Sequence, residues 1–492
     1  MTKTAFLPSS VRSSKKRLTA ASNSFYGFMN TPQKLLSQPD RQSKITGMLF
    51  CFVLLILTIL CYSAHLYSSD EGSVTNLAWH WWNHQAVYID FHEFIPPGAP
   101  LLVLAGWKLF GLSYLGAKIP FIFIGFLSVF FTYLITYRLT RKNTVALFAA
   151  YFWLAASGFY PAINHNTLGS FLAVILTYFL IFPFENRKNV RLIIIGIINA
   201  LILWTLQTKG FTLFAASIFV LITEKRDKNQ KIGFFILCFM ASSFLLYSPW
   251  PLEIIWHNLV VLPFQMDYLG SSFYNYTLYF VSAIFLIIMW LTYRKTQARP
   301  VFVLFALQLA LFLSMFNNFD IFHFMINIAP FLIMMAAYPL LRPKRRLSKL
   351  VANYTLLFFV SLFYFLFAVG NLRTSNIFYS QEPEIFSKIT QNSENVYAGP
   401  FIPGFYFELR KINYFDTYSN EVYCNTDKCQ QQALGTFKRI SPEYAILGFE
   451  MTTKYNYFLE DSAVGTYVVQ NYKICGDFEA LQIYARDDCL VK

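Results

Sequence analysis

The sequence predicts a mainly α-helical, multi-pass membrane protein with a small C-terminal α/β domain, and three observations support this. Of the 492 residues, 56% are hydrophobic, 19% aromatic and only 13% charged, which does not fit a soluble globular domain. The apolar residues form runs that approach the roughly 20 residues needed to cross a bilayer. Residues 372–492 instead alternate polar with apolar positions, as short strands do.

We expect about eleven membrane helices, and a count of thirteen is also compatible with the sequence. The polar, basic segment 1–44 is too long for the n-region of a signal peptide, so we interpret it as a cytoplasmic tail. The membrane domain then spans 45–371. Its predicted helices cover 45–66, 117–137, 144–163, 167–184, 190–208, 210–223, 232–248, 274–293, 300–316, 322–341 and 350–370.

The net charge of +14 would suit a nucleic-acid-binding protein, but its distribution indicates a membrane topology instead. Lys and Arg gather in alternate connectors, which the positive-inside rule places in the cytoplasm. The basic connectors are 138–142, 187–191, 225–231, 294–299 and 342–346. We therefore expect membrane lipids and no nucleic acid as partners, a cytoplasmic N-terminus, and a periplasmic or extracellular C-terminal domain in the plasma (bacterial inner) membrane.

The C-terminal domain is predicted to contain strands near 395–398, 444–448 and 465–469, and four of the seven cysteines. An even number of cysteines outside the cytoplasm suggests two disulfides with three possible pairings. Proximity in the chain favours Cys424–Cys429 and Cys475–Cys489. Four free thiols are the alternative, and a zinc site fits less well because the spacing is Cys-x4-Cys without a nearby histidine.

Four carboxylates stand out in the first long outer loop, residues 67–116. Asp70 and Glu71 follow the first apolar run directly, while Asp90 and Glu93 come later, just before Pro96–Pro97. Carboxylates at a membrane boundary are costly unless they meet water, a cation or a substrate. They are therefore either solvated loop residues or functional groups. The other long outer loop, 249–273, is expected to lie at the membrane interface.

Lys209 lies between two apolar runs on the outer side of the predicted membrane domain, in the motif Thr208-Lys209-Gly210. A lysine in that setting is expensive unless it is paired or functional. The alternative is a side chain that extends to the lipid headgroups.

The order of these motifs resembles a known family. An acidic pair, His92-Glu93-Phe94-Ile95-Pro96-Pro97, Thr208-Lys209-Gly210 and a soluble outer domain follow one another. The segments 114–120 and 323–330 also fit. Together they resemble the polyprenyl-phosphate-sugar-dependent glycosyltransferases of the C-type (GT-C) fold, such as the protein O-mannosyltransferases and the bacterial aminoarabinose transferases of lipid A.

The resemblance implies transfer of a sugar from a polyprenyl-phosphate donor to a lipid, glycan or protein acceptor at the outer membrane face. A carboxylate would take the acceptor proton, and cations would stabilise the leaving phosphate. Two catalytic carboxylates are implied: Asp70 as the general base or as the group that orients the acceptor, and Glu93 as a group that binds acceptor or sugar hydroxyls or shares a metal. Glu71 and Asp90 are supporting residues, and the phosphate ligands are Lys209, His323 and Arg373. Glu71 would cap a helix or pair with a base. The sequence establishes no cofactor, and a divalent metal shared by the acids is an open alternative.

Two departures and two rival functions limit this interpretation. Phe94 stands where the aminoarabinose transferases have a lysine, which weakens a lipid A acceptor, and Lys118 stands where the family has an arginine before a proline. A transporter usually places its charges near the bilayer midplane, and a lipid-linked polysaccharide polymerase or ligase relies on outer-loop arginines. The sugar, the acceptor and the stereochemistry, inverting or retaining, stay open.

Overall fold

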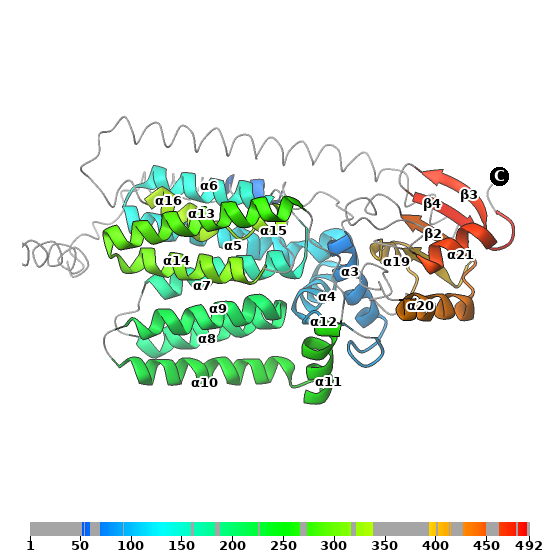
Figure 1. The fold of residues 1–492 in the computed structure, drawn as a ribbon, viewed down its shortest axis with the longest axis horizontal. Helices are drawn as coiled ribbons and strands as arrows, with labels where there is room; N and C mark the ends of the chain where they lie inside the picture. The colour runs from blue at the N-terminus through cyan, green and yellow to red at the C-terminus, as the bar shows by residue number, and fades with distance from the viewer. Residues whose placement is uncertain are drawn as a thin grey trace, which may run out of the picture. The chain divides into compact units, whose positions relative to one another are not determined.

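A computed structural model describes the fold for residues 52–53, 55–59, 69–91, 93–158, 162–182, 187–224, 227–265, 273–315, 321–337, 393–399, 402–412, 414, 427–448, 462–478 and 481–489. The chain divides into two compact units, Met1–Val53 and Leu54–Lys492. Every helix and strand named below belongs to the second unit (Figure 1).

Two short helices precede the main bundle, α3 (Ser69–Trp82) and α4 (Gly98–Phe110). The bundle and its connecting helices follow in this order: α5 (Tyr114–Thr140), α6 (Asn143–Gly158), α7 (His165–Ile181), α8 (Lys188–Thr205), α9 (Gln207–Ile222), α10 (Lys228–Tyr247), α11 (Leu252–Trp256), the π-helix η1 (His257–Val261), α12 (Leu262–Gln265), α13 (Phe273–Thr296), α14 (Arg299–Leu313), α15 (Ile321–Met325) and α16 (Ala329–Ala337).

The apolar runs from 117–137 to 300–316 each coincide with one of these helices. Within the described residues, four helical segments are long and apolar enough to cross a membrane: α5, α8, α10 and residues 276–296 of α13. The totals of eleven or thirteen stay predictions. The run 350–370 lies outside the described residues, and 45–66 is described only in part.

The prediction of one continuous helix over 322–341 is wrong, because α15 and α16 are separated by residues 326–328. Pro330 explains the break. A proline inside a helix would clash with the carbonyl four residues earlier, here that of Ile326, and it cannot donate a backbone hydrogen bond. The helix therefore restarts at Ala329, where Pro330 occupies the first turn.

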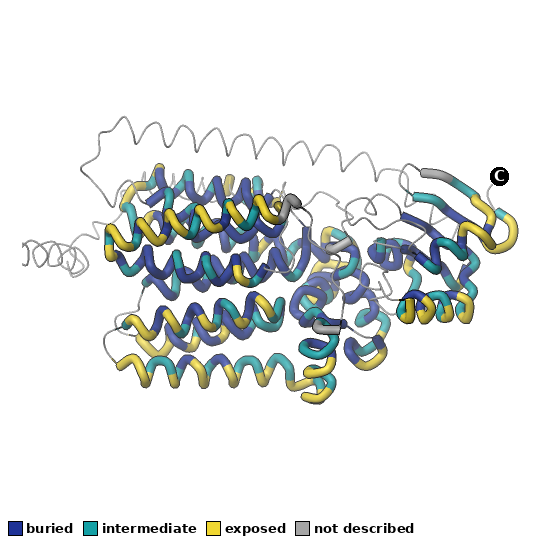
Figure 2. The backbone as a smooth tube through the Cα atoms, viewed as in Figure 1, coloured by how far each residue is buried: buried dark blue, intermediate teal, exposed yellow. Residues whose placement is uncertain are grey.

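The bundle core is apolar and is formed mainly by α7, α8, α9 and α14. Figure 2 shows buried positions concentrated in α7 and α14, whereas α10 is mostly exposed or half-buried, with Phe235 and Phe239 as its buried residues. A charged cluster joins one end of these helices: Glu224 contacts Arg191 at 3.0 Å, Lys231 at 2.7 Å and Arg299 at 2.6 Å. Three of the predicted basic connectors therefore lie at the same end of the bundle.

The C-terminal part contains a four-stranded sheet in the order β1-β2-β4-β3. Its first pair, β1–β2, is parallel and the other pairs are antiparallel. The strands are β1 (Val396–Gly399), β2 (Tyr444–Gly448), β3 (Lys473–Phe478) and β4 (Leu481–Ala485), accompanied by the helices α19 (Gly404–Glu408), α20 (Asp427–Ile440) and α21 (Ala463–Asn471).

Side chains alternate between the two faces of this sheet. Tyr397 and Ala445 pack with α20 and α21, whereas Ala398 and Ile446 share a core with α3 and α4. The sheet is therefore covered on both faces, and one cover comes from the N-terminal part of the chain.

The predicted strand at 465–469 is wrong, because these residues form α21. Ser462 is the cap: its hydroxyl accepts a hydrogen bond from Gly465 N at 2.8 Å, and such a cap favours a helix start. Val464 and Val468 then lie on one buried helix face. The apolar pattern alone suits a strand equally well.

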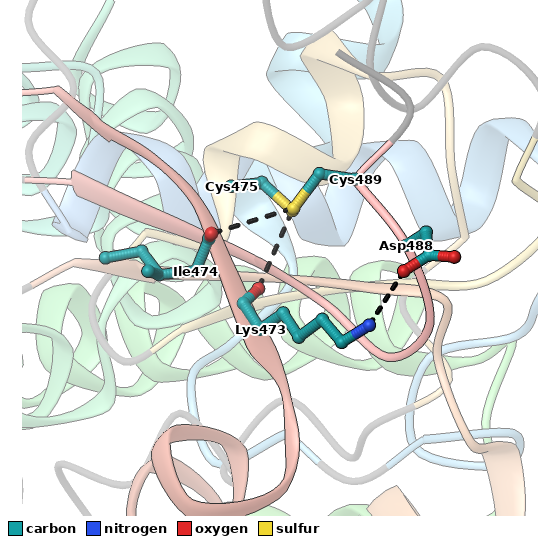
Figure 3. Close-up of a disulfide and its surroundings, with 5 residues drawn as sticks. All are labelled: Lys473, Ile474, Cys475, Asp488 and Cys489. Carbon is teal, nitrogen blue, oxygen red and sulfur yellow. Dashed lines mark hydrogen bonds and ion pairs between the residues drawn. A yellow bond between two sulfur atoms is a disulfide. The ribbon is translucent and has the colours of Figure 1, made fainter. Parts of the chain in front are cut away.

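A disulfide joins Cys475 of β3 to Cys489, as predicted (Figure 3). Beside it, Lys473 Nζ lies 2.7 Å from Asp488 Oδ1, which adds a second link between the same two segments. Cys429 is also disulfide-bonded. Its predicted pairing with Cys424 stays a prediction because Cys424 lies outside the described residues.

Candidate active site

The acidic pair lies in the first turn of α3, a helix that the sequence analysis did not predict. Glu71 is buried, and its Oε1 lies 3.0 Å from Nζ of Lys118 on α5, with each side chain only 1% exposed. Burial raises the pKa of Glu71 to about 7, although Lys118 acts in the opposite direction. Glu71 was expected either to cap a helix or to pair with a basic side chain, and the structure shows the pair with Lys118. The role of its neighbour Asp70 stays a prediction.

Glu93 and Asp90 lie in the same loop between α3 and α4 but have different surroundings. Glu93 is buried, and its Oε1 accepts a hydrogen bond from Ile95 N at 3.0 Å. Asp90 is exposed, and its Oδ2 accepts from Ala86 N at 2.6 Å, which closes a local turn. Only Glu93 therefore belongs to the interior of the site.

Three side chains hold the backbone of this loop by donating to its carbonyl groups. Trp250 Nε1 donates to Val87 O at 3.2 Å, Gln207 Nε2 to Phe94 O at 2.8 Å, and the Tyr88 hydroxyl to Ile95 O at 2.9 Å. Tyr88 itself has a φ of 68°, a left-handed conformation that costs a bulky residue about 1–3 kcal/mol and persists only where the surroundings impose it. The loop thus holds Glu93 beside the junction between α8 and α9.

Lys209 lies in the first turn of α9 and is fully buried. Its Nζ donates to Asn166 O at 2.7 Å and to Ser170 Oγ at 2.8 Å, both on α7. Gly169 leaves room for this approach, since a Cβ there would lie 3.1 Å from Lys209 Cδ. The side chain therefore points into the protein and does not extend to the lipid headgroups.

The electrostatic surroundings of Lys209 are neutral. Both hydrogen-bond acceptors are uncharged oxygens, and none of the carboxylates in the described part of the chain forms an ion pair with it. An ammonium has three N–H donors, and two are used in this network. When protonated, Lys209 therefore has a third N–H donor with which it can bind an anion.

A polar network connects Lys209 to His323. Asn166 Nδ2 lies 2.9 Å from His323 Nε2. Asn327 Oδ1 accepts from Ser170 Oγ at 2.8 Å, and Asn327 Nδ2 donates to His323 O at 2.7 Å. Lys209 and His323, two of the predicted phosphate ligands, are thereby brought together, and Arg373 lies outside the described residues.

The site lies at the end of the bundle opposite the Glu224 cluster. Asn166 is in the first turn of α7, whereas Arg191 binds carbonyl groups near its last turn. With 17 residues, α7 is about 25 Å long. Gln207 holds the Glu93 loop only two residues before Lys209. Lys209 and His323 therefore share the neighbour Asn166, and the loop that contains Glu93 is held at the same end of the bundle by Gln207.

Gln308 also belongs to this network, because its Nε2 donates to Asn327 O at 2.8 Å. Sequence reasoning missed several polar residues of the site: Asn166, Ser170, Gln207, Gln308 and Asn327. A signal was present for two of them, because Asn166 and Ser170 are four residues apart in an apolar helix and so share a helix face. No three His, Cys, Asp or Glu side chains gather as metal ligands within the residues searched, which are those described. A metal shared by Asp70 and Glu93 stays an open alternative.

Comparison with known proteins supports the resemblance drawn from the sequence. Residues 95–256 match the sequence model of the family described as dolichyl-phosphate-mannose-protein mannosyltransferase. This stretch contains Lys118, Asn166 and Lys209. No curated protein sequence matches the chain significantly.

Solved structures match over nearly the whole chain. ArnT from Cupriavidus metallidurans bound to undecaprenyl phosphate is 13% identical, with 91% of this chain and 99% of ArnT covered at a TM-score of 0.61. The apo state of the same ArnT is also 13% identical, with 90% of this chain and 99% of ArnT covered at a TM-score of 0.62. The apo oligosaccharyltransferase of Archaeoglobus fulgidus is 9% identical, with 93% of this chain and 75% of that chain covered at a TM-score of 0.51. The chain therefore has the C-type glycosyltransferase (GT-C) fold, and a third of its sequence is similar to the mannosyltransferase family.

Proposed function

We propose that this protein transfers a sugar from a polyprenyl-phosphate donor to a lipid, glycan or protein acceptor at the extracytoplasmic face of the membrane. The observation that carries the proposal is the fold shared with ArnT bound to undecaprenyl phosphate, which covers 91% of this chain and 99% of ArnT. The acids and the buried lysine supply the groups that such a transfer needs.

The donor phosphate is assigned to Lys209. As the bond between the anomeric carbon and the phosphate oxygen breaks, negative charge grows on the polyprenyl phosphate. A fixed cation in a site with little water stabilises that charge more than it would in bulk water. The neutral oxygens around Lys209 leave its positive charge available for this purpose. His323 supports it through Asn166, and Arg373 is proposed as a further phosphate ligand.

The acceptor is assigned to the acids. Asp70 takes the proton of the acceptor hydroxyl while the acceptor oxygen bonds to the anomeric carbon, and the polyprenyl phosphate leaves with the bonding electrons. Glu93 binds hydroxyl groups of the acceptor or sugar, and its buried, hydrogen-bonded setting keeps its orientation fixed.

The face of the membrane follows from charge and cysteine chemistry. The basic Glu224 cluster marks the opposite end of α7 and α9, which the positive-inside rule places in the cytoplasm. The Cys475–Cys489 disulfide suits an oxidising compartment. We therefore place the N-terminus in the cytoplasm and the C-terminal sheet outside a plasma membrane.

The experiment that tests the proposal measures transfer from radiolabelled polyprenyl-phosphate sugars in membranes that contain the wild type or single variants. Lys209→Met is expected to lower kcat by about 100- to 1000-fold, the usual cost of losing one stabilising donor. Asp70→Asn and Glu93→Gln are also expected to lower kcat. Lys108→Met and Glu394→Gln remove exposed charges of the same kinds, and they are expected to retain wild-type rates.

Two outcomes contradict the proposal. If Lys209→Met and Asp70→Asn both transfer sugar at wild-type rates, the assigned site is wrong. If the wild type transfers none of the labelled sugars to any acceptor in the membranes, the transferase assignment itself fails, and a transporter or a polysaccharide polymerase or ligase becomes the better explanation.

A further inference from the structure

The helix that carries the acidic pair touches the C-terminal part of the chain backbone to backbone. A Cβ atom at Gly72 of α3 would lie 2.8 Å from the backbone N of Gly404 and 3.2 Å from its Cα. No side chain fits between α3 and α19 at this point. Gly72 lies one residue after Glu71 and two residues after Asp70.

The remainder of the contact is made by the segment Gly404–Lys411, which we call the clasp. Trp79 Nε1 of α3 donates to Lys411 O at 2.7 Å. The Arg410 guanidinium carbon lies 4.4 Å from the ring centre of Phe407 and 5.5 Å from that of Trp79. Phe407 also stacks on Trp107 of α4, with the ring centres 4.6 Å apart. The clasp therefore holds both ends of α3.

A second attachment holds α3 from another direction. Glu71 pairs with Lys118 of α5 at 3.0 Å, and successive residues of an α-helix point about 100° apart. The ion pair and the Gly72–Gly404 contact therefore act on different sides of the same turn. Together they set both the rotation of α3 and its distance from its neighbours.

We infer that the clasp is a positioning device for the acids: the C-terminal sheet domain sets where α3 lies, and through α3 where Asp70 lies. The inference rests on the proposed function, in which Asp70 accepts the acceptor proton. Gly72, Trp79 and the clasp act through α3 and need no contact with substrate. Since a misplacement of about 1 Å can cost roughly 100-fold in rate, a small shift of α3 has a large effect on turnover.

The experiment is the substitution Gly72→Ala in the full-length protein, assayed for sugar transfer and for hydrogen exchange of the α3 amides. The added methyl group forces α3 and α19 apart, because the atoms that it meets belong to the backbone. We expect kcat to fall about 10- to 100-fold, the KM for the donor to change less than about twofold, and the α3 amides to exchange faster.

Two further variants keep the test decisive. Gly435→Ala adds the same methyl group to α20, where no atom lies within 4 Å, and it is expected to match the wild type. Trp79→Phe keeps an aromatic side chain but removes the indole N–H that donates to Lys411 O, and it reduces the contact with Phe407 and Arg410. It is expected to produce a smaller loss of the same kind, and it replaces Gly72→Ala as the test if that variant does not fold.

The inference is overturned if α3 exchanges faster in Gly72→Ala or Trp79→Phe while kcat stays at the wild-type value, or if α3 exchange does not change in either variant. It is also overturned if KM rises and kcat does not fall. Failure of the proposed function looks different: the wild type then transfers no sugar, while the exchange data still show whether the clasp holds α3.

Discussion

Lys118 and Lys209 are both buried in the helical bundle, but their surroundings differ. Lys118 has a carboxylate partner, Glu71, at 3.0 Å. Lys209 is surrounded by Asn166 O and Ser170 Oγ, which are neutral. A buried charge that has its counterion serves mainly to join two helices. A buried charge that has only neutral acceptors keeps an unbalanced field, and this is the arrangement expected where an anionic ligand binds.

The largest expected effect is on stability, and it distinguishes the paired Lys118 from Lys209. Glu71→Leu removes the carboxyl oxygen that Lys118 contacts and is expected to destabilise the fold by about 3–5 kcal/mol, as breaking a buried pair does. Lys209→Met removes a charge without a carboxylate partner and is expected to leave stability unchanged or raised. Thermal unfolding in detergent measures both, with Glu71→Leu/Lys118→Leu as the control that restores stability. Equal losses for Glu71→Leu and Lys209→Met would end the distinction.

The next effect is a pH dependence of stability that comes from Glu71. Its pKa is raised from 4.5 to about 7 in the folded protein, so the folded state keeps a proton that the unfolded chain has already released. This contribution to stability is full below pH 4.5 and is lost as the pH rises through 7, a total of roughly 3 kcal/mol.

The unfolding temperature of the wild type should fall between pH 5 and pH 8 relative to that of Glu71→Gln, whose side chain does not titrate. If the difference in unfolding temperature between the wild type and Glu71→Gln stays constant from pH 5 to pH 8, the pKa of Glu71 is not raised.

The smallest effect concerns the network around Lys209. Ser170→Ala removes one acceptor of the Lys209 ammonium and the donor to Asn327, with an expected cost of about 1 kcal/mol in stability. Relative to the wild type, the KM for the donor should change more in Ser170→Ala than in the control Ser157→Ala, which removes a buried hydroxyl on α6. Identical KM values in the two variants would show that the network does not prepare Lys209 for its ligand.

The sequence predicts the bundle well because long apolar runs have few alternatives to membrane helices. The sequence-based prediction fails where a single residue determines the structure, or where the determining contact comes from a distant part of the chain. The break before α16 depends on Pro330, and α21 depends on the Ser462 cap. α3 was missed because its apolar side faces a sheet that begins more than 300 residues later.

The site shows the same limit. Lys209 and Glu93 stand out in the sequence because charge is rare in apolar surroundings. Their neighbours Asn166 and Gln207 do not, because a single amide in a helix or at its start has many ordinary explanations. The pairing of Glu71 with Lys118 was open from the sequence, since spacing along the chain does not give the distance between α3 and α5.

The hydrogen bond from Trp79 to Lys411 joins residues 332 positions apart, and this separation has a consequence for biosynthesis. At about 5–20 residues per second, the ribosome adds Lys411 roughly 15 to 65 s after Trp79. During that interval the helix with the acidic pair lacks its final partner. A chain that is cut short before the clasp is thus expected to stay inactive even with every catalytic side chain already made.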